Sequence, residues 1–269
     1  MRGHIMRAAT AGRPWTPANI TTALWLDAAD ASTITTVSGA VSQWNDKSEN
    51  GRNATQGTAG NRPAYSSTGF NSRPGVSFDG TDDFMSIGGG TISGTGYHYA
   101  MAIKPGAAAI TSVDGDAVFW LQNAYNANGF LHILYRSNIA SKFRTSINSD
   151  GVATNINTKY LTTDATTSEQ ILAYGGPSTN LRLNGTLQAN GSDIATVANT
   201  ISYSGLAAEI GRYYVTTGYN GAFDIAEFVL ISSPSNNDIL KLEGYLAHKW
   251  GLTANLPNDH PYKTTAPAV

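Results

Sequence analysis

Hydrophobic and polar residues alternate along several short segments of the chain. In residues 97–104 (YHYAMAIK) every second position from Tyr97 to Ile103 carries a large apolar side chain. Residues 142–148 (KFRTSIN) alternate in the same way. Alternation with a period of two predicts half-buried strands of an antiparallel sheet.

Two other segments are apolar on both faces, 117–122 (AVFWLQ) and 223–231 (FDIAEFVLI). Such strands are expected in the middle of a sheet that is covered on both sides. Turn signals are dense between the predicted strands, because Asn and Asp before Gly accept the positive φ angles of tight hairpins. Asn-Gly occurs at positions 50, 128, 184, 190 and 220, and Asp-Gly at 79, 114 and 150. Many short antiparallel strands in a sandwich are therefore predicted.

One segment has the period of a helix, residues 236–250 near the C-terminus. Ser235 followed by Asp238 fits a capping box, and Gly251 with Leu252 fits a helix end in the left-handed conformation. The predicted buried stripe consists of Ile239, Leu242, Leu246 and Trp250. Lys241 and His248 fall on another face and are expected in solvent. The helix is interpreted as a clasp on the end of the sandwich.

The chain has 269 residues, which suits one large β-domain. We expect an N-terminal arm (1–20), a sandwich domain (21–254) that includes the helix, and an extended C-terminal tail (255–269). The arms are expected to contact a neighbouring subunit or a partner.

Composition narrows the function. Charged residues make up 13% of the chain and the net charge is -2, so no general attraction to nucleic acid or anionic lipid is expected. The chain has no cysteine, which excludes disulfides and thiolate zinc sites. The basic N-terminus lacks an apolar stretch behind it, so no signal peptide is expected. The chain also has no run of about 20 apolar residues, the length that a transmembrane helix needs. Together these features predict a protein that is made in the cytoplasm and does not enter a membrane.

Three runs, LWLDAADASTI (24–34), QWNDKSENGRNATQ (43–56) and RPGVSFDGTDDFM (73–85), together resemble the opening of laminin-G-like domains. These domains belong to the concanavalin A-like lectin/glucanase superfamily. NLRLNGTL (180–187) and residues 218–252 resemble their hairpin and their closing strand and helix. The resemblance implies an all-β, antiparallel jelly-roll β-sandwich with one short C-terminal amphipathic helix.

The closing pattern EGYLAHKWGL, then LP and HPY, is similar to one found in bacteriophage virion proteins and large bacterial surface proteins. The first hypothesis is therefore a non-enzymatic virion structural protein, such as a head decoration or a tail fibre component. Its partners would be other virion proteins, itself as a homo-oligomer, and a cell-surface glycan. The alternative is a carbohydrate-binding module of a receptor-binding or cell-surface protein. A glycoside hydrolase or polysaccharide lyase ranks below both.

Catalysis is disfavoured by the chemistry of one strand. Glucanases of this superfamily place three acidic residues in the pattern E-x-D-x-x-E, because a retaining mechanism needs two carboxylates about 5 Å apart. Here Asp224 and Glu227 match that pattern, but Ala222 occupies the position of the nucleophile. A structural role for Asp224 and Glu227 is preferred.

The resemblance also implies a possible calcium site at a loop rim. Calcium takes several oxygen ligands, and the candidate carboxylates lie in two turns. They are Asp79, Asp82 and Asp83 in the first turn, and Asp114 and Asp116 in the second. The simpler interpretation is that these residues bond their own backbone. Zinc at His248 and His260 is a weaker hypothesis, because only Asp259 lies near them in the sequence.

A glycan site needs aromatic faces with polar neighbours. The candidate aromatic residues are Tyr125, Tyr213, Tyr214 and Tyr219. A basic row is a separate candidate. His132 and Arg136 share a face of one predicted strand, and Lys142 and Arg144 share a face of the next, so the four residues form a row if these two strands pair as a hairpin. Such a row would suit an acidic glycan or a subunit's carboxylates. Ordinary strand packing of the tyrosines and a merely solvated basic face remain the alternatives.

Overall fold

A computed structural model describes residues 12–88, 97–106, 116–122, 130–136, 142–148, 156–161, 166–175, 180–188, 208–212 and 220–269. Its first strands are β1 (Thr22–Asp27), β2 (Ile34–Val37), β3 (Ala40–Trp44), β4 (Ala54–Thr55), β5 (Ala64–Phe70), β6 (Arg73–Asp79), β7 (Met85–Ile87) and β8 (His98–Pro105). The remaining strands are β9 (Asp116–Gln122), β10 (Phe130–Arg136), β11 (Lys142–Asn148), β12 (Ile156–Tyr160), β13 (Gln170–Gly175), β14 (Asn180–Leu183), β15 (Thr186–Leu187), β16 (Ala208–Ile210) and β17 (Ala222–Ile231). Helix α1 (Asn236–Trp250) follows β17 directly in the chain.

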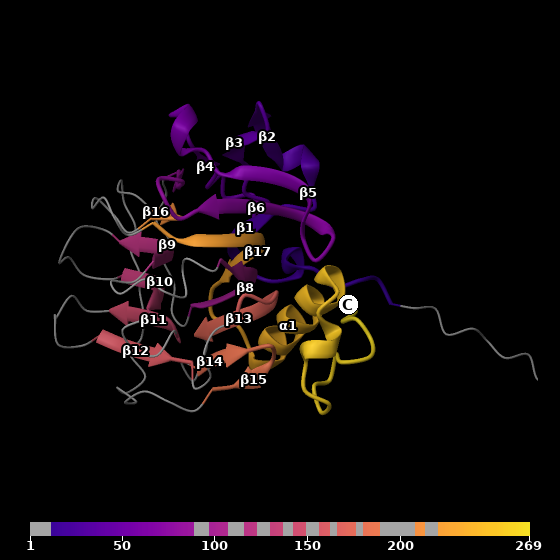
Figure 1. Cartoon of the computed structure of the whole chain (residues 1–269). Helices are drawn as coiled ribbons and strands as arrows, with labels where there is room; N and C mark the ends of the chain where they lie inside the picture. Colours follow the sequence, from indigo (N-terminus) through magenta and orange to yellow (C-terminus); the bar gives the residue numbers. More distant parts are fainter. Residues whose placement is uncertain are drawn as a thin grey trace, which may run out of the picture.

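The strands form two antiparallel layers (Figure 1). In the first layer β17 pairs on one edge with β1 and β6, and on the other with β8, which continues to β13, β14 and β15. In the second layer the order is β4, β7, β16, β9, β10, β11 and β12. Strand β3 pairs with β2, β4 and β5 and so connects the two layers.

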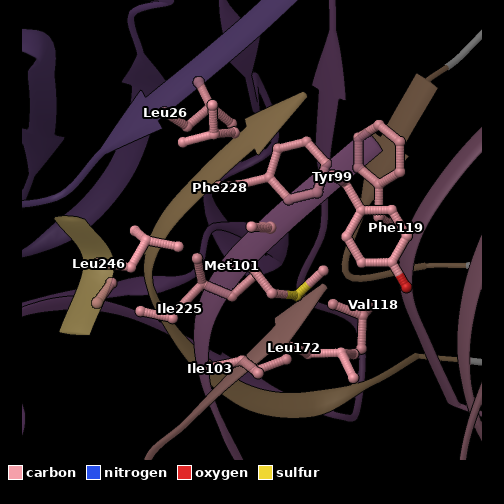
Figure 2. Packing of buried hydrophobic residues seen from close by; sticks show 14 of the residues in the cluster. Leu26, Tyr99, Met101, Ile103, Val118, Phe119, Leu172, Ile225, Phe228 and Leu246 are labelled. Carbon is pink, nitrogen blue, oxygen red and sulfur yellow. The ribbon is translucent and has the colours of Figure 1, made fainter. Parts of the chain in front are cut away.

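The core lies between the layers. Phe119 of β9 stacks on Phe228 of β17 with ring centroids 4.6 Å apart, and Tyr99 of β8 stacks on the same ring at 6.3 Å. Figure 2 shows these rings packed with Met101 and Leu172. Burial of this apolar surface is the main stabilising contribution to the fold. The predicted antiparallel sandwich with one C-terminal helix is confirmed.

Strand β17 is central, as its two apolar faces predict, and it has neighbours on both edges. The prediction for β8 was wrong in one respect. Residues 98–103 are buried on both faces, whereas alternation predicted one solvated face. The reason is that α1 packs against β8 and β13, and small residues such as Ala100 and Ala102 leave room for it.

The turn signals had mixed outcomes. Asn184 and Gly185 join β14 to β15 with φ angles of 50° and 77°, as expected for a tight hairpin. Asn50-Gly51 lies instead in a loop, and Asn220 forms an isolated bridge. The pairs at 114, 128, 150 and 190 lie outside the described residues.

Helix α1 begins and ends where the sequence predicts. The Ser235 side chain accepts a hydrogen bond from the Asp238 N–H, and the Asp238 carboxylate accepts from the Ser235 N–H at 2.9 Å. At the other end Gly251 has φ 73°, and the Leu252 N–H donates to the Ala247 carbonyl at 2.8 Å. The predicted stripe is buried. Within the described ranges, no helix has the length and apolar character needed to cross a membrane.

The segment after α1 does not extend away from the domain, so the prediction of an extended tail was wrong. Leu256 and His260 are buried. His248, expected in solvent, lies with its Nε2 2.9 Å from the carbonyl oxygen of Tyr262. Tyr262 packs so closely on Gly244 of α1 that a Cβ atom there would collide with it. The residues after the helix therefore form a strap over its outer side.

The two ends of the described chain pair with each other. The Trp15 N–H donates to the Pro267 carbonyl at 3.0 Å, and the Val269 N–H donates to the Arg13 carbonyl at 2.9 Å. The Trp15 side chain is buried and meets the ring of Tyr245 edge-on at 6.1 Å. From residue 12 onward, the predicted N-terminal arm therefore packs on the domain. Contact of the arms with a neighbouring subunit stays a prediction.

The loop 45–53 covers the edge of β1 that faces away from its partner strand β17. Asp46 Oδ1 accepts a hydrogen bond from the Trp25 N–H at 2.9 Å, and its Oδ2 accepts from the Arg52 N–H at 3.1 Å. The Arg52 guanidinium in turn donates to the Ala23 carbonyl at 2.6 Å. Two of the sequence runs that resemble laminin-G-like domains thus meet here, where they satisfy backbone groups of an edge strand.

Candidate functional site

The turn that follows β6 gathers three of the predicted metal ligands. One carboxylate oxygen each from Asp79, Asp82 and Asp83 lies within 4.8 Å of the others. Asp79 Oδ1 accepts a hydrogen bond from the Thr81 N–H at 2.7 Å, and Asp83 Oδ2 accepts from the Asp79 N–H at 3.0 Å. The predicted backbone-bonding role is therefore present. Each carboxylate also keeps an oxygen that accepts no hydrogen bond from the described residues.

The carboxyl of Asp83 is buried beside two other carboxylates. Burial, with a smaller contribution from the charges of Asp79 and Asp82, raises its pKa to about 6 despite the backbone hydrogen bond that lowers it. Among the described residues, no lysine or arginine forms an ion pair with any of the three. A hard cation such as Ca²⁺ prefers this kind of oxygen donor set, so the residues fit calcium in charge and chemistry.

A second segment reaches the same turn from far along the chain. Arg212 and Asn220 form an isolated antiparallel bridge, and the Asn220 side-chain amide donates to the carbonyl oxygen of Thr81. Asn220 is only 9% exposed. Its Oδ1 is buried and has no hydrogen-bond partner among the described residues. We call Asp79, Asp82, Asp83, Arg212 and Asn220 the rim.

The rim is also where a predicted tyrosine loop begins and ends. Tyr213 follows Arg212 directly and Tyr219 precedes Asn220 directly. Tyr213, Tyr214 and Tyr219 themselves lie outside the described residues, as does Tyr125. The structure therefore brings the acidic turn and both ends of this loop together, which the sequence alone did not indicate. Asn220 gave only a turn signal, through its Asn-Gly pair.

Arg212 is held in place by two neighbours. Its guanidinium lies 3.5 Å from the centroid of the Phe84 ring. It also donates two hydrogen bonds to Glu209, at 2.7 and 3.0 Å. This fork geometry is the strong form of an arginine–carboxylate pair. Arg212, from which the loop 213–219 starts, is therefore fixed in position, and its positive charge is compensated by Glu209.

The second predicted calcium turn is not brought to the rim by any described contact. Asp114 lies outside the described residues. Asp116 opens β9 opposite Tyr135, and its side chain lies outside the described part of the structure.

Glu227 has a structural role, in agreement with the preferred interpretation. It is fully buried beneath α1. Its Oε1 accepts hydrogen bonds from Trp25 Nε1 at 2.6 Å and from the Tyr245 hydroxyl at 2.9 Å. Its Oε2 accepts from Trp250 Nε1 at 2.7 Å and from Lys249 Nζ at 2.8 Å. A carboxylate enclosed by four donors is not accessible to a substrate.

The charges around Glu227 form a chain toward the surface. Lys249 also contacts Asp27 at 2.7 Å, Asp27 contacts Lys47 at 2.8 Å, and Lys47 contacts Asp30 at 2.9 Å. Burial raises the pKa of Glu227, and the neighbouring Lys249 ammonium opposes that shift. The two indole groups can only donate, so both carboxyl oxygens of Glu227 serve as acceptors.

Glu243, which is buried on α1, contacts both β14 and the strap. It accepts hydrogen bonds from Arg182 at 2.6 and 3.0 Å, and His260 Nε2 lies 3.3 Å away. Burial alone would raise the pKa of Glu243, but its bonds to His260 and Arg182 lower it overall. His98 lies nearby in β8, and complete burial lowers its pKa to about 4. Arg182, Glu243 and His98 were not recognised from the sequence, and His260 was considered only as a zinc ligand.

The zinc hypothesis for His248 and His260 finds no support in this geometry. His248 contacts the Tyr262 carbonyl and His260 contacts Glu243. In the described part of the chain, no group of three potential metal ligands contains a histidine.

The structure pairs β10 with β11 as an antiparallel hairpin. Arg136 lies directly opposite Lys142, Leu134 opposite Arg144, and His132 opposite Ser146. The four predicted basic residues therefore occupy positions on one face of the second layer. Their side chains lie outside the described part of the structure.

Comparison with known proteins shows a shared fold. No family model matches the chain, and no curated protein matches it. The solved structures that resemble it include the binding domain of botulinum neurotoxin serotype G, with TM-score 0.57, 10% identity, and 82% of this chain matched to 50% of that one. Trypanosoma rangeli sialidase matches with TM-score 0.52 and 11% identity over 90% of this chain and 37% of that one. Domain 4 of the extracellular arabinanase AbnA from Geobacillus stearothermophilus, in complex with arabinotriose, matches with TM-score 0.51 and 14% identity over 79% of this chain and 93% of that domain.

These similarities agree with the predicted concanavalin A-like sandwich. At such low sequence identity they carry the fold alone. The chain spans about half the length of the neurotoxin binding domains that it matches. None of the structures named above comes from a virion, so the virion role stays a prediction.

Proposed function

We propose that this domain is a non-catalytic carbohydrate-binding module with its site at the rim. The observation that carries this proposal is the contact of Asn220 with Thr81. It joins the acidic turn to one end of the loop 213–219, and the bridge between Asn220 and Arg212 brings the other end to the same place. The loop contains three of the predicted tyrosines. Aromatic faces and polar groups that converge at one edge of a sandwich are what a sugar ring requires.

Four of the rim residues contact the sugar in this proposal. The free oxygens of Asp79, Asp82 and Asp83 accept hydrogen bonds from sugar hydroxyls. The unpaired Oδ1 of Asn220 offers a further acceptor. An unpaired buried acceptor is costly unless a ligand or water satisfies it, so a site that binds polyhydroxylated molecules gives this oxygen a purpose.

Calcium has a place in the same proposal. Asp79, Asp82 and Asp83 would hold the ion, which would neutralise the charge of the three neighbouring carboxylates. The bound ion would also supply an electrophilic centre for vicinal hydroxyls. The domain's own residues would orient the sugar, through the asparagine amide and the tyrosine faces.

The absence of catalysis is part of the proposal. Of the two acidic residues that match the glucanase pattern, Glu227 is enclosed by four donors. Ala222 supplies no carboxylate at the position of the nucleophile. When the purified domain is incubated with the oligosaccharides that it binds, no new reducing ends should therefore form.

Two named relatives in fold motivate the choice of ligand class. The arabinanase domain was solved with arabinotriose, and the neurotoxin domains are named for receptor binding. We propose that this chain likewise recognises a saccharide, at a cell surface or as part of a larger assembly. The virion hypothesis is compatible with glycan recognition, since a fibre component would use the same site.

The experiment is a glycan microarray followed by calorimetric titration of the bound oligosaccharides, with calcium or with EDTA. Asn220→Ala, Asp83→Asn and Tyr219→Ala should each weaken binding about tenfold or more, because each removes a direct contact of roughly 1–3 kcal/mol. Asp259→Asn is the matched control, since Asp259 is exposed in the strap. Binding that survives all three rim variants unchanged, or no binding to any glycan, would contradict the proposal.

A further inference from the structure

We propose that the outer face of β9, β10, β11 and β12 is a second binding surface, for an anionic polysaccharide. The positions come from strand register. Arg136 and Lys142 are directly opposed, and Arg144 lies two residues beyond Lys142 on the same face of β11. Opposed residues of an antiparallel pair lie about 5 Å apart, and residues two apart along a strand about 7 Å. Three strand positions that hold permanently charged residues thus lie close together on one face.

The register also identifies which face this is. Phe119 stacks on Phe228 of the opposite layer, so its side chain faces the core. Its partner in β10 is Ile133, and the partner of Ile133 in β11 is Thr145, which is 1% exposed. Because neighbours along a strand alternate between faces, His132 and Arg144 occupy the face that points away from the core.

That face is separate from the helix. Helix α1 packs on β8 and β13 of the other layer, and Figure 1 shows β9 to β12 stacked on the opposite side of the molecule. Three neighbouring strands of this layer place Glu209, Trp120 and His132 side by side: Glu209 of β16 pairs with Trp120 of β9, and Trp120 pairs with His132 of β10. The Glu209 charge is already paired with Arg212.

The charge balance of these four strands contrasts with the whole chain. Their sequences contain Arg136, Lys142 and Arg144 at positions on this face. The other basic residue, Lys159, pairs with the core-facing Thr145, and the one acidic residue of these strands is Asp116. Asp116 pairs with Tyr135, whose position belongs to the core-facing set. The whole chain has a net charge of -2. The basic face is therefore a local concentration of positive charge on an otherwise weakly acidic protein.

Such an arrangement is not explained by stability. Like charges directly opposite each other on a sheet destabilise it, so the pair Arg136 and Lys142 costs free energy in the absence of an anion. A ligand that carries carboxylate or sulfate groups would remove that cost, and arginine binds both in a two-pronged geometry.

Aromatic positions border the charges on the same face. Trp120 pairs with His132, and Tyr160 pairs with Arg144. Aromatic rings beside arginines suit sugar rings that carry acidic groups, because the ring stacks while the guanidinium binds the anion. A nucleic acid fits less well. Its phosphates are dense, with one charge per about 1.7 Å of duplex, and proteins that bind it meet it with many more cations than three.

The test is equilibrium binding of the full chain to three immobilised polymers: heparin, polygalacturonate and neutral dextran. Binding to at least one acidic polymer, weaker at higher salt, and none to dextran is expected. Heparin alone would identify sulfate as the recognised group, and polygalacturonate alone would identify carboxylate. Failure to bind either polymer, or tighter binding to duplex DNA than to both, would overturn the proposal.

Variants then locate the surface. Removing three charges in Arg136→Gln/Lys142→Gln/Arg144→Gln should weaken binding at least a hundredfold and flatten its salt dependence, whereas Lys241→Gln, on α1, should change it less than twofold. If the triple variant does not fold by circular dichroism, Arg144→Gln alone should weaken binding about tenfold. Equal affinity for the basic-face variants and Lys241→Gln would refute the location. Binding of neutral glycans on the microarray is measured in parallel and tests the rim. The basic face and the rim are thus tested by different ligands, so one proposal can fail while the other holds.

Discussion

Replacing Glu227 with glutamine keeps the shape of the side chain and removes its charge. In the native protein Oε1 faces Trp25 Nε1 and the Tyr245 hydroxyl, while Oε2 faces Trp250 Nε1 and Lys249. A glutamine amide has one acceptor oxygen and one NH₂ donor. Whichever way it turns, one indole N–H loses its acceptor.

The better orientation places the NH₂ toward Tyr245, whose hydroxyl can accept, and leaves the Trp25 N–H unpaired. A buried unpaired donor costs about 1–3 kcal/mol. Lys249 keeps Asp27 at 2.7 Å but loses its contact with a full negative charge. Breaking a wholly buried ion pair costs about 3–5 kcal/mol, and the part contributed here is smaller because Lys249 is 21% exposed. We expect Glu227→Gln to lower the free energy of unfolding by about 2–4 kcal/mol.

The assay is urea unfolding followed by tryptophan fluorescence at pH 7, with circular dichroism as a second probe. Asp224→Asn is the matched control, because Asp224 lies on the same strand, is half-buried and pairs in register with Lys104. It should cost under about 1 kcal/mol. If Glu227→Gln is as stable as this control, the four-donor arrangement does not stabilise the fold and the reasoning fails.

Gly244→Ala should lower the free energy of unfolding by about 1–3 kcal/mol although alanine favours helices, because its Cβ would collide with Tyr262; a thermal midpoint at or above that of the wild type would contradict this. Asp83 has a pKa of about 6 against 3.8 unfolded, so its contribution to stability should fall as pH rises through that interval, and urea midpoints of Asp83→Asn should lack that decline. His98 has a pKa of about 4 against 6.5 unfolded, so its contribution should rise with pH across that interval and be lost in His98→Leu. If both variants give the wild-type pH profile, neither group titrates as described.

Local patterns in the sequence predicted the local structure well. The Ser235 and Asp238 capping box, the apolar stripe and Gly251 defined α1 to the residue, because helix ends depend on neighbours within four positions. Strand β17 was placed centrally from its two apolar faces. The face shared by the basic residues of β10 and β11 followed from alternation once the two strands were paired.

Contacts between distant parts of the chain could not be predicted in this way. The rim joins Asn220 to Thr81 across 139 residues, and the Glu227 site joins Trp25 across 202 residues. Periodicity says which face a residue occupies but not which strand lies beside it. The strap was misjudged for a related reason. Its prolines suggested an extended chain, whereas Gly185 and Gly244 leave the space that lets it pack.

The pairing of the chain ends has a mechanical consequence. Residues 13–15 run antiparallel to residues 267–269, so Gly12 and Val269 lie together at the same end of this short ribbon. A force that separates these two points would load the hydrogen bond between Arg13 and Val269 first, and the bond between Trp15 and Pro267 only after the first had broken. Sequential loading of this kind resists weakly. The ribbon would open at low tension while the sandwich behind it, anchored by the buried Trp15, stayed folded.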